Sequence, residues 1–140
     1  MNKLLPILCC LFLPVLCHAQ DADTKLASQV AVSFYDGYLL VAKGKHADPA
    51  KYVYDSRLVT AAFQNAYRKF RVNPDNDSDP ILNAQDTPKK GYHVQKVQIN
   101  GIGGFIILQN DNHEFPTLTL EMLKTNYGWQ INGIDDLLGR

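Results

Sequence analysis

The chain has 140 residues, of which 46% are hydrophobic and 20% charged, and its formal net charge is zero. This length allows one domain rather than two, and the apolar content is too high for a disordered chain. A balanced charge supplies neither the basic surplus nor the basic patch that would attract nucleic acid or an anionic membrane. We therefore expect a single folded domain that does not bind nucleic acid.

Residues 1–19 have the pattern of a cleaved secretory signal. A lysine near the N-terminus precedes a nearly continuous apolar run over residues 4–16, and Ala19 supplies a small residue at the cleavage position. Cleavage there would make Gln20 the first mature residue. Two alternatives stay open. The segment could be retained as an anchor, although it is shorter than the roughly 20 residues of a membrane span. Cys17 could carry a lipid, although a leucine rather than a small residue precedes it.

All three cysteines of the chain, Cys9, Cys10 and Cys17, lie within this predicted signal. The mature chain is therefore expected to have no disulfide, no thiolate nucleophile and no cysteine-ligated metal. Export without cysteines is more typical of the bacterial periplasm than of a eukaryotic exterior. We predict a periplasmic protein with no stable membrane insertion after cleavage.

Residues 24–43 predict the first helix of the mature chain. The apolar side chains that share one helical face are Leu26, Val30, Phe34, Tyr38 and Val41. Gly37 interrupts this run and costs about 1 kcal/mol relative to alanine in a helix, which suggests that another group packs closely against it. Lys43 and Gly44 are expected to end the helix.

Two further helices are predicted before a long polar loop. Asp48 and Pro49 fit the N-cap and the first position of a short helix. Residues 56–72 predict a longer helix, capped by Asp55 or Ser56, whose broad apolar stripe indicates burial. The loop over residues 73–91 contains three prolines, and a loop of this length in a small domain is often functional.

After Gly91 the pattern changes to that of strands. Four are predicted, over residues 92–99, 102–109, 117–125 and 129–134. The Asn100-Gly101 pair is a strong hairpin signal, and Gly103-Gly104 suggests a bulge or a bend. The connections are too short for crossovers, so the strands form an antiparallel meander. The predicted fold is α+β, with the N-terminal helices packed on one face of this curved sheet.

The aspartates of the 73–91 loop fit the spacing of a calcium-binding loop. The ligand positions would be Asp75, Asp77, Asp79, the Ile81 carbonyl, Asn83 and Asp86. Pro80 stands where the template needs glycine for a sharp turn, the last ligand is a shorter arm than the usual glutamate, and a strand rather than a helix follows. We favour the alternative, a solvated cluster of turns capped by its own side chains.

Gln85 and Asp86 close this loop after the apolar residues Ile81, Leu82 and Ala84. That order predicts a segment docked on the core, with a carboxylate that is buried and hydrogen-bonded to backbone N–H groups or to a tyrosine hydroxyl. The second interpretation places the same pair on the floor of a ligand pocket.

The mature sequence carries no catalytic or metal-binding signature. His46, His93 and His113 lie in different predicted elements with no zinc-binding spacing, and no nucleophile elbow occurs. Asp36 and Glu121 are candidate carboxylates, but pairing two carboxylates requires geometry. The glycines at 101, 103 and 104 indicate a hairpin rather than a phosphate loop. No catalytic residue, metal or cofactor is predicted. The seven tyrosines suit either a core or a binding surface, because each joins apolar area to a polar end.

Three segments together resemble a known family, the small exported bacterial domains grouped as DUF3828. They are Phe34-Tyr35-x-x-Tyr38-Leu39, Asp79-Pro80-Ile81-Leu82-x-Ala84-Gln85-Asp86 and Gly128-Trp129-x-Ile131-x-x-Ile134. The resemblance implies a fold similar to the NTF2-like (cystatin-like) cone of helices wrapped by a curved sheet, over residues 20–140. It carries no catalytic residues. Small exported domains of this shape include immunity proteins that block toxins delivered by type VI secretion, which is an analogy of architecture and compartment.

Two functions remain open at this point. The first is a non-catalytic periplasmic protein that binds and inhibits another protein, such as a secreted toxin, through the loops over residues 73–91 and 110–116. The second is a small-molecule binder or enzyme that uses the interior of the cone. The candidate binding residues are Tyr38, Tyr67, Gln85, Asp86, His93 and His113.

Overall fold

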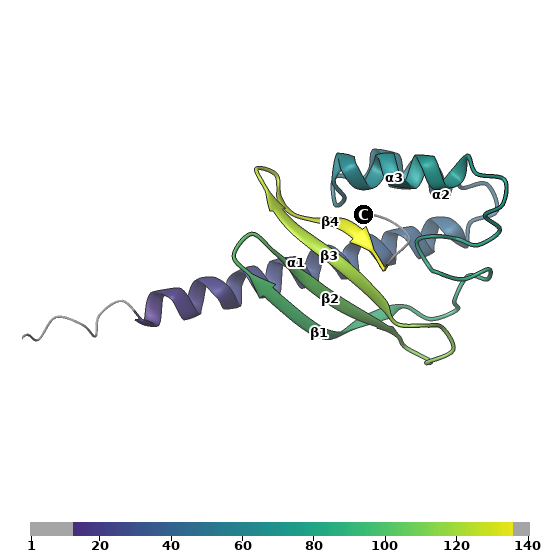
Figure 1. The fold of residues 1–140 in the computed structure, drawn as a ribbon. Coiled ribbons are helices and arrows are strands. Elements are labelled where there is room, and N and C mark those ends of the chain that lie inside the picture. The colour runs from purple at the N-terminus through teal and green to yellow at the C-terminus, as the bar shows by residue number, and fades with distance from the viewer. Residues whose placement is uncertain (1–12, 136–140) are drawn as a thin grey trace, which may run out of the picture.

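The computed structural model describes residues 13–135, and its elements form the predicted α+β fold (Figure 1). The three helices are α1 (Leu13–Ala42), α2 (Pro49–Asp55) and α3 (Ala61–Arg71), and the four strands are β1 (Tyr92–Asn100), β2 (Gly103–Asn110), β3 (Leu118–Thr125) and β4 (Gly128–Ile134). The strands form one antiparallel sheet in the order β1-β2-β3-β4. Helix α1 crosses one face of this sheet and packs on β1 and β4, α2 lies against α1, and α3 lies beside β4.

Helix α1 is longer than the sequence pattern predicts. It begins at Leu13 rather than at residue 24 and ends at Ala42, so the end of the predicted signal and the first mature helix form one continuous helix. Residues 1–12, with most of the predicted signal, lie outside the described residues. Two side chains tie this part of α1 to the sheet, Gln20, whose amide donates to the Ile99 carbonyl at 3.4 Å, and Asp23. The Asp23 carboxylate accepts hydrogen bonds from Trp129 at 3.1 Å and from Lys124 at 2.7 Å.

The prediction for α2 is confirmed and that for α3 is partly wrong. The side chain of Asp48 accepts hydrogen bonds from the backbone N–H groups of residues 50 and 51, as an N-cap does. Helix α3, however, begins five residues later than predicted, with Thr60 rather than Asp55 or Ser56 as its N-cap. The reason is that Val59 pairs in parallel with Ile131 of β4. Residues 58–60 thereby add a short extended segment to the edge of the sheet, which excludes them from the helix.

The sheet follows the predicted meander with two local differences. The hairpin turn consists of Gly101 (φ +61°) and Ile102, one residue later than Asn100-Gly101. The predicted bulge at Gly103-Gly104 is wrong, since both residues pair in register with β1 and β3. Bulges instead lie at Gln95 in β1 and at Asn132 in β4, between the residues that pair with Glu121 and Met122. Gly104 allows close packing of backbones, because a Cβ there would lie 2.8 Å from Cα of Ile99.

The core lies between α1 and the sheet. Alternate strand residues point into it, among them Leu118, Leu120 and Met122, which confirms the alternation predicted for this strand. The helices contribute aromatic side chains, of which Phe34, Tyr35 and Phe63 are fully buried. Among the elements of residues 13–135, no helix lies over the opposite face of the sheet (Figure 1).

Candidate functional site

Two of the predicted binding residues, Tyr38 and Tyr67, lie in the interior and not on an open cavity. Each is 1% exposed. The Tyr38 hydroxyl donates to the Asp79 carboxylate at 2.6 Å, and the ring of Tyr67 packs edge-on against Tyr54 with 5.7 Å between their centroids. Since the side chains that were expected to line a pocket are packed in the core, the interior of the fold is filled at this position.

Asp79 lies at the centre of this buried polar group. Its second carboxylate oxygen accepts hydrogen bonds from the backbone N–H groups of Ile81 and Leu82 at 2.8 and 3.3 Å. Nearby, the Tyr35 hydroxyl donates to the Ile81 carbonyl at 2.8 Å. These contacts hold the start of the DPIL segment, residues 79–82, against α1. We call this group the tyrosine–aspartate cluster.

The tyrosines around Asp79 are held in their neutral form. Burial raises the pKa of Tyr38, and the adjacent Asp79 charge raises it further. Burial also raises the pKa of both Tyr67 and Tyr92 to about 12, with the Asp79 charge acting in the same direction. Ionising a phenol beside a carboxylate in a dry interior is unfavourable. The tyrosine hydroxyls of the cluster therefore stay protonated near neutral pH, and their role is structural.

The tyrosine–aspartate cluster holds the middle of the 73–91 loop against the core, and the loop residues that follow are exposed to solvent. Ile81 and Leu82 are fully buried, which confirms that this segment docks on the core. The next residues, 83–87, are largely exposed, and Asn83 turns the chain with φ +48°. The interpretation of Asp86 as a buried, hydrogen-bonded carboxylate is wrong, because Gln85 and Asp86 are exposed. Residues 83–87 form what we call the loop tip.

The calcium template does not assemble in this loop. The carboxylate oxygens of Asp79 accept hydrogen bonds from a tyrosine hydroxyl and from backbone N–H groups. Asp75, Asp77 and Asp86 are exposed. Among residues 13–135, no three histidine, cysteine, aspartate or glutamate side chains are grouped as a metal site would need.

The other two predicted binding residues, His93 and His113, lie together on the surface. Nδ1 of His93 lies 2.7 Å from Oδ1 of Asp111, and the two imidazole rings are 6.5 Å apart between centroids in an edge-on arrangement. His113 has φ +55°, a conformation that non-glycine residues seldom adopt. This surface group thus comes from the start of β1 and from the 111–117 connection.

The two loops that were predicted as contact surfaces meet beside this histidine group. The buried Asn110 side chain donates to the carbonyls of Lys90 and Gly91 at 3.2 and 3.0 Å. The backbone N–H of Asp111 donates to Gly91 at 3.0 Å. Asn110 therefore joins the end of the 73–91 loop to the start of the 111–117 connection. We call the exposed side chains of the loop tip, His93, Asp111 and His113 the two-loop surface.

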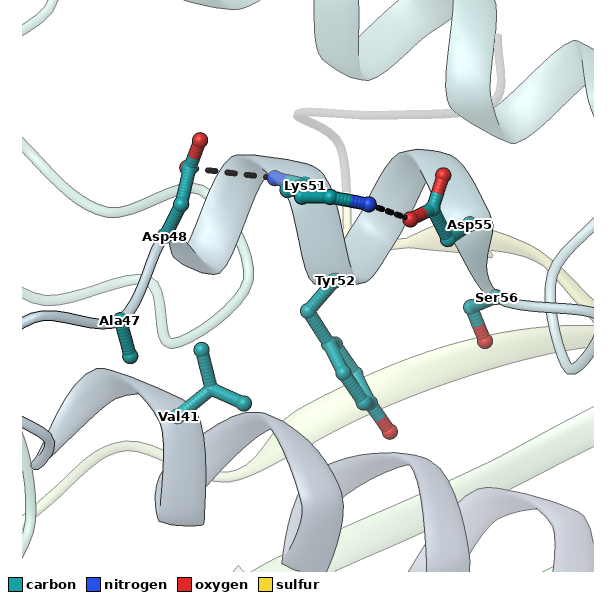
Figure 2. A pocket seen from close by; sticks show the side chains of 7 residues that line it. All are labelled: Val41, Ala47, Asp48, Lys51, Tyr52, Asp55 and Ser56. Carbon is teal, nitrogen blue, oxygen red and sulfur yellow. Dashed lines mark hydrogen bonds and ion pairs between the residues drawn. The ribbon is translucent and has the colours of Figure 1, made fainter.

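A hollow of about 400 Å³ lies elsewhere, between α1 and α2 (Figure 2). Its lining residues are Val41, Ala47, Asp48, Lys51, Tyr52, Asp55 and Ser56. Figure 2 shows the Tyr52 ring extending from α2 toward α1, where its hydroxyl donates to the Phe34 carbonyl at 3.0 Å. The charged side chains of the rim, Lys51 and Asp55, form an ion pair with each other. None of the six predicted binding residues lies in this hollow.

The chemistry available at the two-loop surface is recognition through hydrogen bonds and charge. The His93–Asp111 contact orients an imidazole, but no hydroxyl or thiol in the described part of the chain hydrogen-bonds to that ring. Such a contact is the usual sign of a nucleophile–base pair. The helices within residues 13–135 include none with the length and apolarity that crossing a membrane demands.

Sequence reasoning missed Asn110 and Asp111, and it considered Asp79 only as a calcium-loop position and as part of the family resemblance. Asp79 had a visible signal, because an aspartate before proline and two large apolar residues is typical of a side-chain-capped turn. No sequence pattern indicated Asn110 or Asp111, since their roles depend on the pairing of β1 with β2. No family model, curated protein or solved structure matches the chain.

Proposed function

We propose that this chain is an exported, non-catalytic protein that binds and inhibits another protein through its two-loop surface. The observation that carries the proposal is the filled interior. Tyr38 and Tyr67, two of the polar candidates for a ligand pocket, are 1% exposed and belong to the packed core. Recognition is thereby assigned to the outside of the molecule.

The construction of the two-loop surface supports this assignment. The tyrosine–aspartate cluster fixes the chain directly before the loop tip, and Asn110 fixes Lys90 and Gly91, a few residues after it, to the neighbouring connection. A pinned loop loses little conformational entropy when it binds, which favours affinity. Its exposed Gln85 and Asp86, with His93 and His113, offer donors, acceptors and charge at a protein interface.

The partner that we propose is a toxin acting in the periplasm, of the kind delivered by type VI secretion. The signal-like residues 1–19 and the resemblance to exported DUF3828 domains with an NTF2-like cone support this compartment and class. An inhibitor needs only shape and polar complementarity to cover an active site, and the two-loop surface can supply both.

A protection assay tests this function. The product of the neighbouring gene would be directed to the periplasm of cells that also produce either the wild-type chain or a variant. We expect the wild type to restore growth and a Gln85→Ala, Asp86→Ala, His113→Ala triple variant to lose most of that protection. All three side chains are exposed, so the variant should keep the wild-type melting temperature.

The matched control is Tyr127→Ala. Tyr127 is 90% exposed and lies in the β3–β4 turn, at the opposite end of the sheet from the two-loop surface (Figure 1). We expect the Tyr127→Ala variant to protect cells as well as the wild type does. Absence of protection and of binding by the wild-type chain would refute the function, and equal protection by the triple variant would refute the surface.

A further inference from the structure

The open face of the sheet carries an apolar centre with one charge on either side of it. We call this face the open sheet face, and its outward side chains include Lys96, Gln98, Phe105, Ile107, Glu121 and Leu123. Phe105 is 51% exposed. The outer face of an antiparallel sheet is ordinarily polar, so an exposed phenylalanine beside Ile107 and Leu123 is a candidate contact surface.

The two charges lie on the strands that flank Phe105. Lys96 is on β1, opposite Ile107 of β2, and Glu121 is on β3, opposite Phe105 of β2. Their positions therefore differ by two residues along β2, or about 7 Å. Neither side chain makes an ion pair or a hydrogen bond to the rest of residues 13–135, although three other ion pairs form there.

We propose that the open sheet face pairs with the same face of a second copy of this chain, to form a weak symmetric dimer. A two-fold axis parallel to β2 exchanges the two sides of that strand. It brings β1 of one copy over β3 of the other, so each Lys96 approaches the partner's Glu121 while the two Phe105 rings meet at the centre. Sheets packed face to face lie about 10 Å apart, which two long side chains span.

Charge complementarity is what selects a second copy over an unrelated protein. A face with one cation and one anion on opposite sides of an apolar centre matches itself under this rotation, and both pairs form at once. An interface built on these strands is about 15 Å wide and 27 Å long. That area, about 400 Å² per copy, is below the usual range for specific complexes, so we expect dissociation in the micromolar range or weaker. The dimer is argued from Lys96, Phe105 and Glu121 and does not rest on the proposed function, although His93 of the two-loop surface lies on the same face of the sheet, at the start of β1.

Sedimentation velocity on the full mature chain, from a few to several hundred micromolar in low salt, tests the dimer. The wild type should shift from monomer toward dimer over this range, and Phe105→Glu should remain monomeric. Lys96→Glu and Glu121→Lys should each raise the dissociation constant about tenfold or more, because each change places like charges opposite one another. Lys25→Glu, an exposed change on α1, is the matched control and should dimerise as the wild type does.

Mixing the two charge variants gives the decisive result. In a mixed dimer both glutamates of the Lys96→Glu copy face both lysines of the Glu121→Lys copy, so an equimolar mixture should dimerise about as well as the wild type. Circular dichroism of every variant verifies its fold, and the mixture decides even where Phe105→Glu is unfolded. A wild type that stays monomeric throughout, or a mixture no better than its components, overturns the proposal. A monomeric wild type whose Phe105→Glu variant loses toxin protection assigns the face to another protein instead.

Discussion

Gly37 of α1 makes a sharp test of how α1 and α2 are held together. A Cβ added at this position would lie 2.9 Å from Cζ and 3.0 Å from Cε2 of Tyr52, and closer still to the hydroxyl oxygen. Gly37→Ala therefore forces the Tyr52 ring away from α1. The Tyr52 hydroxyl would then lose its hydrogen bond of 3.0 Å to the Phe34 carbonyl.

The size of this effect follows from two opposing contributions. Alanine is favoured over glycine within a helix by about 1 kcal/mol, which alone would stabilise the variant. Moving the half-buried ring costs about 1–3 kcal/mol, as other overpacked sites do, and the lost hydrogen bond adds about 1 kcal/mol. We expect Gly37→Ala to lower the free energy of unfolding by about 1–3 kcal/mol in total.

Urea unfolding of a double-mutant cycle measures this balance. In a Tyr52→Ala background the steric conflict is gone, so Gly37→Ala should raise the free energy of unfolding by about 0.5–1 kcal/mol. The sign of the effect thus reverses between the two backgrounds. A stabilising Gly37→Ala in the wild-type background would refute the reasoning, as would an equal loss in both backgrounds.

The other predictions concern three separate contacts. Tyr38→Phe should lower the free energy of unfolding by about 1.5–3 kcal/mol in urea titrations, because its hydroxyl bonds a carboxylate. Tyr92→Phe is the matched control and should be nearly neutral, since the Tyr92 hydroxyl has no partner among the described residues; equal losses would contradict this account. Thr60→Ala should cost about 1–2 kcal/mol by removing the α3 cap, and Thr60→Ser should restore most of it. The hydrogen bond from Lys124 holds the pKa of Asp23 below its ordinary value, so this contact stabilises the fold above about pH 4 and is lost as the pH falls further. Asp23→Asn should therefore lower the melting temperature at pH 7, and a difference that persists unchanged at about pH 2 would refute the assignment.

The architecture was predictable because it depends on local patterns. Strand alternation, the Asp48-Pro49 helix start and the short connections are properties of neighbouring residues, and together they specify helices followed by an antiparallel meander. The close packing suggested by Gly37 is confirmed, although nothing local could identify Tyr52 as its neighbour. The later start of α3 depends on the pairing of Val59 with Ile131, residues far apart in the sequence whose interaction overrides helix propensity.

The candidate site was less predictable for the same reason. The histidines at 93 and 113 were proposed separately, and only the turn between β2 and β3 places them together beside Asp111. Asp79 rather than Asp86 is partly buried because it is the carboxylate of the loop that meets the Tyr38 hydroxyl. The sequence shows that the loop carries several acidic residues. Only the folded conformation of the loop determines which of them is hydrogen-bonded within the fold.

If the chain is exported as we propose, the continuity of α1 sets an order of events during that export. The peptide bond between Ala19 and Gln20 lies inside this helix, directly before the residue that contacts Ile99 of the sheet. A protease cleaves a helical segment only when it opens locally. On the proposed route, the leader is therefore removed while the chain is still emerging, and a precursor allowed to mature first would become a poor substrate for its own peptidase.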